Sequence, residues 1–238
     1  MDQPKLPTKV SPVEWIGPDH PGYEETGLIH YAHIPREASL DDSAPVVVMV
    51  HGKYGDESAM WIFKQTIPAG VAIVSPRAPL VSPNGGGFVW FDSANGTLQP
   101  TAEGLQTGLL KLTHFIDGLR YLYPINPDRL LLMGFSQGAA ISNAFALNYP
   151  NRVLGVASLA GAMVQPFDLM PAPELDGLPV FMAHGLEDDT IPVSQAQKTR
   201  DHYQALGAKI TYGEYRTGHK MTVPAIKALK DWVSEQLK

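Results

Sequence analysis

A regular alternation of apolar runs and helical stripes from residue 46 to the C-terminus constrains the fold of this chain more than any other feature. The run from Val46 to Val50 is continuous and mostly β-branched, which is typical of a central parallel strand buried on both faces. Strands are expected at 46–50, 71–75, 130–133, 153–160, 178–185 and 209–212, and helices around 58–66, after Pro100, after Ser136, at 194–206 and at 223–237. This alternation predicts an α/β fold with a mainly parallel central sheet and helices on both faces.

Composition limits the domain count and the partners. A chain of 238 residues with 44% apolar content can bury a full core, so we expect one domain over 1–238, with an N-terminal arm and edge strands in 1–45 and the core in 46–238. The net charge is −6 and no basic run occurs, which argues against a nucleic-acid partner. The chain contains no cysteine, which excludes disulfides, thiolate metal sites and a thiol nucleophile. No apolar run reaches the roughly 18 residues of a membrane span, and no apolar signal segment is visible, so we expect a cytoplasmic protein without stable membrane insertion.

The N-terminal region departs from the alternating pattern. Residues 1–25 are rich in proline and polar side chains and are interpreted as a loose arm. Apolar and polar side chains alternate well enough in residues 28–34 to predict a half-exposed strand that contains His30 and His33. The spacing of these two histidines suits neither a helical metal pair nor a pair on one face of a strand, so both are interpreted as structural or surface residues.

The most informative local motif is Gly134-Phe135-Ser136-Gln137-Gly138, a G-x-S-x-G pattern between an apolar strand and an Ala-rich helix. The two glycines lack a Cβ, so the turn can tighten until the serine is strained and its hydroxyl is exposed above the sheet. The pattern alone is a weak signal, but the strand–turn–helix context is the one that a nucleophilic serine requires. The sequence therefore predicts that Ser136 is a nucleophile.

A serine hydroxyl needs a base within hydrogen-bond reach, and an imidazole suits that role near neutral pH. His219 is the candidate base because it lies downstream of the serine, in the loop between the last expected strand and the last helix. An orienting acid should lie between the two, and the segment after the strand at 178–185 offers Glu187, Asp188 and Asp189. Residue chemistry alone does not choose among these three carboxylates.

Acyl transfer also needs two backbone N–H groups aimed at the developing oxyanion. Gln137 is the first candidate because it follows the nucleophile at the start of a helix. The second should come from the loop after the strand at 46–50, where His51 and Gly52 are followed by Lys53 and Tyr54. Lys53 is favoured, with Tyr54 as the alternative.

Further motifs accompany these in one order along the chain. They read His-Gly-x-x-Gly-Asp, Ser-Pro-Arg-Ala-Pro, Trp90-Phe91-Asp92, Gly-Phe-Ser-Gln-Gly-Ala-Ala, His-Gly-x-x-Asp-x-x-Ile-Pro and Gly-His. From about residue 46 to the C-terminus the chain resembles the phospholipase/carboxylesterase family of α/β-hydrolases, which includes the acyl-protein thioesterases. The resemblance implies an α/β-hydrolase fold whose catalytic core is 46–238, with Ser136 as nucleophile, Asp188 as acid and His219 as base. It also implies that no metal and no organic cofactor take part.

Two departures from the family pattern are visible. The stretch after His51-Gly52 is one residue longer than usual, which leaves the choice between Lys53 and Tyr54 open. Ala139 stands where the family commonly has glycine. The connection between Ala160 and Leu178 is short, so little or no cap is expected and the site should be open.

The loop from 76 to 100 contains Phe88, Trp90 and Phe91, which are candidates for an apolar wall on the acyl side of a substrate; ordinary packing of the loop is the alternative. We expect a small-molecule ester of short or medium acyl length, cleaved through an acyl-enzyme. Lysophospholipid or acyl-thioester hydrolysis is the nearer alternative, and a non-catalytic ligand-binding protein of the same fold is the alternative of another class. The physiological ester, its chain length and the oligomeric state, a homodimer among the options, stay open.

Overall fold

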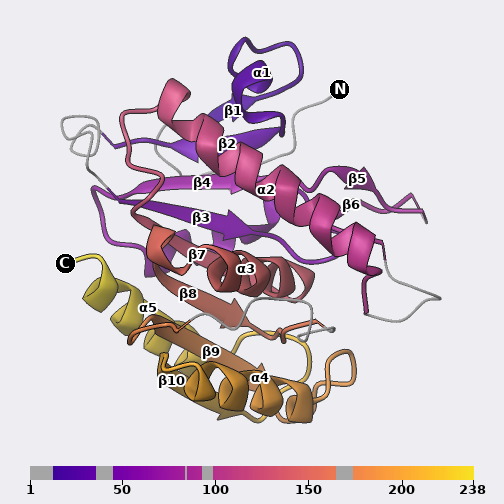
Figure 1. Cartoon of the computed structure of the whole chain (residues 1–238), viewed down its shortest axis with the longest axis vertical. Coiled ribbons are helices and arrows are strands. Elements are labelled where there is room, and N and C mark those ends of the chain that lie inside the picture. Colours follow the sequence, from indigo (N-terminus) through magenta and orange to yellow (C-terminus); the bar gives the residue numbers. More distant parts are fainter. Residues whose placement is uncertain (1–12, 36–44, 84, 93–98, 165–173) are drawn as a thin grey trace.

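Eight strands form one sheet in the computed structural model, which describes residues 13–35, 45–83, 85–92, 99–164 and 174–238 (Figure 1). The strand order is β1-β2-β4-β3-β7-β8-β9-β10. The six strands from β4 to β10 pair in parallel, whereas β2 is antiparallel to both β1 and β4. The strands are β1 (Glu14–Ile16), β2 (His30–His33), β3 (Val46–Val50), β4 (Ala72–Pro76), β7 (Leu130–Phe135), β8 (Val153–Leu159), β9 (Pro179–Gly185) and β10 (Lys209–Tyr215).

Helices cover both faces of this sheet, as the alternating sequence predicted. The helical elements are α1 (Gly22–Thr26), the 3₁₀ helix η2 (Ala59–Thr66), α2 (Ala102–Leu122), α3 (Gln137–Asn148), the short η4 (Pro150–Arg152), α4 (Val193–Ala205) and α5 (Val223–Gln236). On one face of the sheet, buried side chains of α2, α3 and α4 pack with strand residues into one hydrophobic core. On the other face, buried side chains of η2 and α5 pack with strand residues into a second core. In Figure 1, α2, α3 and α4 cross in front of the sheet.

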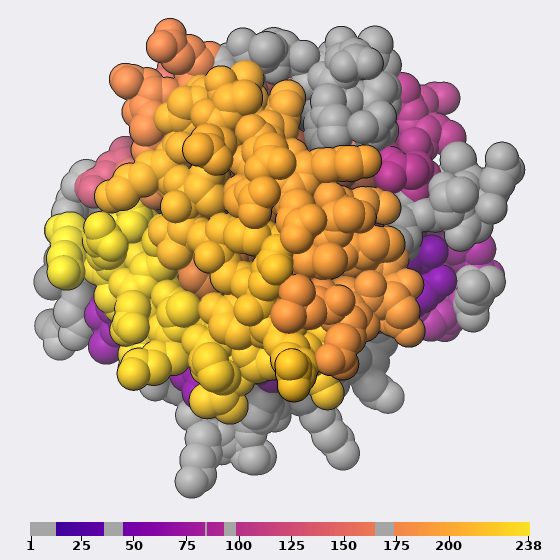
Figure 2. Space-filling view, turned by 90° about the horizontal axis from the view of Figure 1, so that it is seen from below, coloured from indigo at the N-terminus to yellow at the C-terminus, as the bar shows by residue number. Residues whose placement is uncertain are grey.

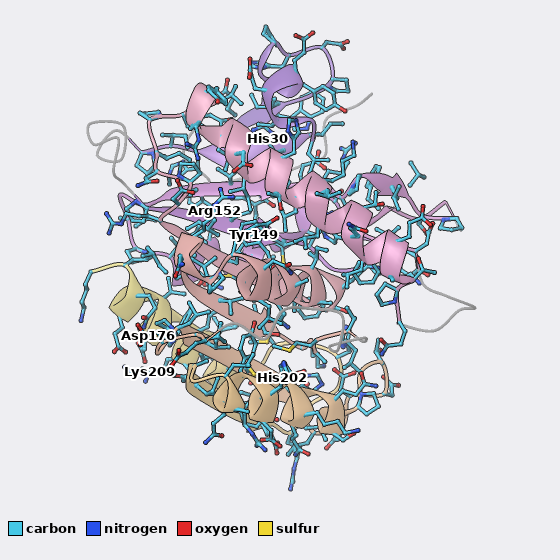
Figure 3. All side chains as sticks on the ribbon, in the orientation of Figure 1. His30, Tyr149, Arg152, Asp176, His202 and Lys209 are labelled. Carbon is cyan, nitrogen blue, oxygen red and sulfur yellow. The ribbon has the colours of Figure 1, made fainter. Side chains whose placement is uncertain are left out.

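The ends of the helices follow from local chemistry. The Thr101 side chain accepts a hydrogen bond from the Gly104 N–H at 3.0 Å and caps the start of α2. Thr222 caps α5 in the same way, and Pro150 follows the end of α3, where a helix cannot continue. Arg152 ion-pairs with Asp117 of α2 at 2.6 Å, which ties the end of α3 to α2 at the amino ends of the parallel strands (Figure 3).

Two expectations about the N-terminal half need correction. The described part of the arm expected at 1–25 is not loose, because it contains β1 and most of α1. The strand at 28–34 is not half-exposed: in β2, His30, Tyr31 and Ala32 are buried. The reason is that β2 lies between β1 and β4 and is covered on both faces. Tyr31 belongs to the core that includes η2, and Ala32 belongs to the core that includes α2. His30 lies beside α2 and hydrogen-bonds the Leu28 carbonyl and the Tyr123 hydroxyl, each at 2.9 Å, so it is structural (Figure 3).

The loop from 76 to 100 contains more structure than its composition predicted. Its described part includes a small antiparallel pair, β5 (Leu80–Val81) and β6 (Phe88–Val89). Residues 93–98 of this loop lie outside the described residues, as do residues 165–173 of the connection after Ala160.

The two edges of the sheet are β1, from the N-terminal part of the chain, and β10, from the C-terminal part. Figure 2 shows the β10 side of the molecule, where the orange and yellow segments make up most of the visible surface. The strand β10 alternates between exposed and half-buried residues, as an edge strand does. Among the helices that the structure describes, none is both long enough and apolar enough to cross a membrane.

Candidate active site

Ser136 occupies a strained turn between β7 and α3. It has φ 54° and ψ −117°, a conformation that a residue with a side chain rarely adopts. The flanking glycines explain how the turn closes so tightly. A Cβ on Gly134 would lie 2.3 Å from the Gly138 carbonyl oxygen, and a Cβ on Gly138 would lie 2.1 Å from the Val50 carbonyl oxygen. A side chain on Gly134 would therefore push the start of α3 away from β7, and one on Gly138 would push it away from β3.

His219 lies between Ser136 and Asp188 and hydrogen-bonds both. Its Nε2 is 2.9 Å from the Ser136 Oγ, and its Nδ1 is 2.7 Å from the Asp188 Oδ2. An ionised carboxylate can only accept, so Nδ1 carries the proton and Nε2 is free to accept the serine proton. The ring of Phe135 packs against the imidazole with centroids 5.1 Å apart. The three side chains have the geometry expected of a nucleophile, a base and an orienting acid in one hydrogen-bonded series.

The structure distinguishes among the three carboxylates that the sequence offered. Asp188 is buried and accepts hydrogen bonds from the backbone N–H groups of Thr190 and Ile191, both at 2.9 Å, on its second oxygen. These bonds leave its other oxygen directed to His219. Glu187 and Asp189 are exposed to solvent. Neighbouring loop residues thus point in different directions, and only Asp188 reaches the imidazole.

The loop after β3 is fixed by the buried ring of His51. Its Nε2 accepts a hydrogen bond from the Ala78 N–H at 2.9 Å, so Nδ1 carries the proton and donates to the Gly52 carbonyl at 2.7 Å. Burial lowers the pKa of His51 to about 4, so the ring is neutral at pH 7. Because a planar trans peptide places its N–H opposite its C=O, the bond from His51 also fixes the direction of the Lys53 N–H.

Tyr54, the alternative oxyanion donor, has its N–H already occupied. That group donates to the Phe88 carbonyl at 2.9 Å, and the Phe88 N–H donates back to the Gly55 carbonyl at 3.0 Å. Within the described ranges no backbone carbonyl accepts from the N–H of Lys53 or of Gln137. Lys53 and Gln137 both line the space next to the Ser136 side chain. Their N–H groups are therefore the pair available to an oxyanion there.

The three aromatic residues of the 76–100 loop separate in space. Phe91 lines a small hollow beside Ser136, whereas Phe88 and Trp90 line a different cavity, which includes Arg77 and Lys111. The buried Trp90 instead braces the site: its indole N–H donates to the His51 carbonyl at 2.8 Å.

Gln137 contributes its side chain as well as its backbone. Its amide oxygen accepts from the Trp90 N–H, and its amide nitrogen donates to the Phe91 carbonyl, both at 2.9 Å. Sequence reasoning missed this role, because nothing in the local pattern links residues 137 and 90. A further brace that it missed is Glu57, which is fully buried, pairs with Arg77 at 2.6 Å and accepts from the Trp15 indole at 2.9 Å.

A hollow of about 490 Å³ opens beside Ser136 and His219, between η2 and α5. Its apolar lining comes from Met60, Ile62, Phe63, Phe135, Met221 and Ile226. The sequence did not predict this wall, because its residues come from η2, β7 and the region of Met221 and Ile226, which are far apart in the chain. In the part of the chain that the structure describes, no three His, Asp or Glu side chains are grouped so as to hold a metal ion.

The chain is similar to several known proteins in sequence and in fold. A model of the phospholipase/carboxylesterase family matches residues 35–237. Acyl-protein thioesterase 1 of Kluyveromyces lactis is 30% identical over 233 residues, which cover 85% of this chain and 97% of that protein. Carboxylesterase SOBER1 of Arabidopsis thaliana is 24% identical, with 84% of this chain and 88% of that protein covered. The crystal structure of a Bacillus cereus carboxylesterase superposes with a TM-score of 0.79 at 20% identity, covering 90% of this chain and 97% of that one, and it confirms the predicted fold.

Proposed function

The chain belongs to the phospholipase/carboxylesterase family and is a carboxylic ester hydrolase, and we propose that it cleaves esters of short to medium acyl chains with Ser136 as nucleophile. The observation that carries this proposal is the bridging position of His219, 2.9 Å from the Ser136 Oγ and 2.7 Å from Asp188. A buried acid, a base and a strained serine in hydrogen-bonded series form the arrangement that activates a hydroxyl near neutral pH.

In the first half-reaction, the Ser136 Oγ attacks the carbonyl carbon of the ester while its proton passes to Nε2 of His219. The carbonyl oxygen becomes an oxyanion, which the N–H groups of Lys53 and Gln137 stabilise. The bond between the carbonyl carbon and the alcohol oxygen then breaks, and that oxygen takes the proton from Nε2. The free alcohol leaves, and the acyl group stays esterified to Ser136.

In the second half-reaction, a water molecule attacks the acyl carbon and gives its proton to Nε2 of His219. The same two N–H groups hold the second oxyanion. When the bond to Ser136 breaks, the imidazolium returns its proton to the serine oxygen, and a carboxylic acid leaves. Asp188 stabilises the imidazolium in both halves without itself taking a proton.

Hydrolysis of p-nitrophenyl acetate, butanoate and octanoate tests the proposal, with the wild type beside Ser136→Ala and a matched Ser234→Ala control on the exposed face of α5. We expect Ser136→Ala to lose about 10⁴-fold or more of kcat and the control to keep wild-type rates. An inactive wild type, or a fully active Ser136→Ala protein, overturns the proposal and favours a ligand-binding role for the fold.

Acyl-thioester hydrolysis is the second candidate. It is supported by the likeness to proteins named acyl-protein thioesterase 1, and the same attack on a carbonyl carbon serves an ester and a thioester. Comparing an ethyl ester with the ethyl thioester of the same acid separates the two, because the acyl-enzyme is identical and only the leaving atom differs.

We further propose a cytoplasmic location, in keeping with a chain that contains no cysteine.

A further inference from the structure

Two hollows of very different size flank Ser136. The larger, of about 490 Å³, lies between η2 and α5. The smaller, of about 30 Å³, lies on the α3 side of the sheet and is bounded, among the described residues, by Phe91, Gln137, Ala140, Ala162 and Met163. Ser136 and Lys53 line both hollows, so the reacting centre and one oxyanion donor lie at the boundary between them.

The position of His219 distinguishes the two hollows chemically. His219 and its neighbours Lys220 and Met221 line the larger hollow, and no described residue of this loop lines the smaller one. The alcohol oxygen of an ester must lie within hydrogen-bond reach of Nε2, because it takes the proton from that atom when the ester bond breaks. The alcohol part of the substrate therefore projects into the hollow that His219 lines.

The acyl group must then take the opposite direction. With the serine oxygen on one corner of the tetrahedral intermediate, the oxyanion between the Lys53 and Gln137 N–H groups, and the alcohol oxygen at His219, one corner remains. That corner points away from His219 toward the small hollow, whose lining includes the buried Ala162 and Met163 as well as the two proposed oxyanion donors. Within the lining that the described residues form, a long acyl chain has little room there.

We propose that this site selects esters of a small acyl group with a bulky apolar alcohol, and that the hollow between η2 and α5 is the alcohol pocket. The inference rests on the function proposed above. The lining supports an apolar occupant: Ile62 is 62% exposed and Tyr54 is 48% exposed at this hollow, so both have apolar surface for an alcohol chain to cover.

Isomeric esters test this directly. Hexyl acetate and methyl heptanoate are isomers with similar hydrophobicity, and both release an unactivated alcohol. They differ in whether the long chain lies on the alcohol side or on the acyl side of the ester. Rates of acid release at constant pH should give hexyl acetate a kcat/KM at least 20-fold above that of methyl heptanoate. Within the series from ethyl to hexyl acetate, kcat/KM should rise about threefold to fourfold per added methylene until the pocket is full.

Two variants assign each hollow to its part of the substrate. Ile226→Phe narrows the larger hollow and should lower the ratio of hexyl acetate to ethyl acetate turnover by 10-fold or more. Met163→Ala widens the smaller hollow and should raise kcat/KM for methyl heptanoate. Leu110→Phe, on an exposed site of α2, is the matched control. It should change neither the ratio of hexyl acetate to ethyl acetate turnover nor kcat/KM for methyl heptanoate. Thermal unfolding of each variant confirms that it is folded.

The outcomes separate this inference from the function on which it rests. If the wild type cleaves p-nitrophenyl acetate but cleaves methyl heptanoate as well as hexyl acetate, the assignment of the hollows is wrong while the hydrolase function stands. The same conclusion follows if Ile226→Phe changes acyl-length selectivity instead of alcohol selectivity. If the wild type cleaves no ester at all, the proposed function itself fails.

Discussion

The side-chain oxygen of Gln137 accepts a hydrogen bond from the backbone N–H of Trp90 at 2.9 Å. This contact joins the residue after Ser136 to the 76–100 loop. Trp90 in turn donates from its indole to the His51 carbonyl in the loop after β3. The two backbone segments that we propose as sources of the oxyanion donors are therefore held to each other by one intervening residue, Trp90. An oxyanion hole needs such rigidity to act without reorganising.

Replacing Gln137 by methionine keeps the size and the backbone N–H but removes this brace. We expect kcat to fall about 10- to 100-fold with a smaller change in KM, because misplaced donors weaken binding of the transition state more than binding of the substrate. Steady-state kinetics on p-nitrophenyl acetate measure both constants. Gln197→Met, at an exposed glutamine of α4, is the control, and an equal loss in both variants would contradict the bracing role.

Asp188→Asn tests the choice among three neighbouring carboxylates. The amide favours the wrong imidazole tautomer and no longer stabilises the imidazolium, so kcat should fall about 10⁴-fold. Asp189→Asn makes the same chemical change one residue away on an exposed side chain and should leave kcat unchanged. If the two variants behave alike in ester hydrolysis, Asp188 is not the orienting acid.

Lys53 should act through its backbone and not through its ammonium group. Lys53→Ala keeps the N–H and should stay within about threefold of wild-type kcat, whereas Lys53→Pro removes it and should cost about 10²- to 10³-fold. Thermal unfolding of the proline variant distinguishes a lost donor from a lost fold. A folded Lys53→Pro protein with wild-type kcat would rule out this donor.

Glu57→Gln should destabilise the protein strongly. Glu57 is fully buried and its partner Arg77 has 13% of its side chain exposed, so the neutral amide leaves a largely buried charge unpaired, at a cost of about 3 kcal/mol in the free energy of unfolding. Asp201→Asn, which breaks the exposed pair with Arg200, should cost about 0.5 kcal/mol or less. Urea unfolding at one fixed pH compares the two, and similar midpoints would refute the structural role of Glu57.

Stability should decline in acid because of two buried histidines. Burial lowers the pKa of both His30 and His51 from 6.5 to about 4. Between these values the unfolded chain binds protons that the folded protein does not, so the free energy of unfolding falls as pH falls from about 6.5 toward 4, by up to about 1.4 kcal/mol per pH unit for each histidine. Urea midpoints across this range should show the slope, and His30→Gln should remove about half of it; an unchanged slope would contradict the assignment.

The fold class and the chain positions of the main chemical groups could be predicted from the sequence alone. Strand and helix periods are local properties of the backbone, so the parallel sheet and the turn at Ser136 are visible in short stretches of residues. The family resemblance added the choice of Asp188. The half-exposed strand expected at 28–34 was wrong because burial of β2 depends on β1, β4 and two separate cores, and none of these is local to it.

Which of these groups come into contact depends on the tertiary fold. The sequence favoured Lys53 over Tyr54 as the second oxyanion donor, and the hydrogen bond from the Tyr54 N–H to the Phe88 carbonyl supplies a geometric reason for that choice. Sequence reasoning treated Phe88, Trp90 and Phe91 as one wall, yet they line different cavities. The alcohol pocket proposed here combines residues of η2 with residues of α5, more than 150 positions apart in the chain. Such contacts depend on how elements that are distant in the chain pack on the sheet, and a local sequence pattern does not specify which distant elements become neighbours.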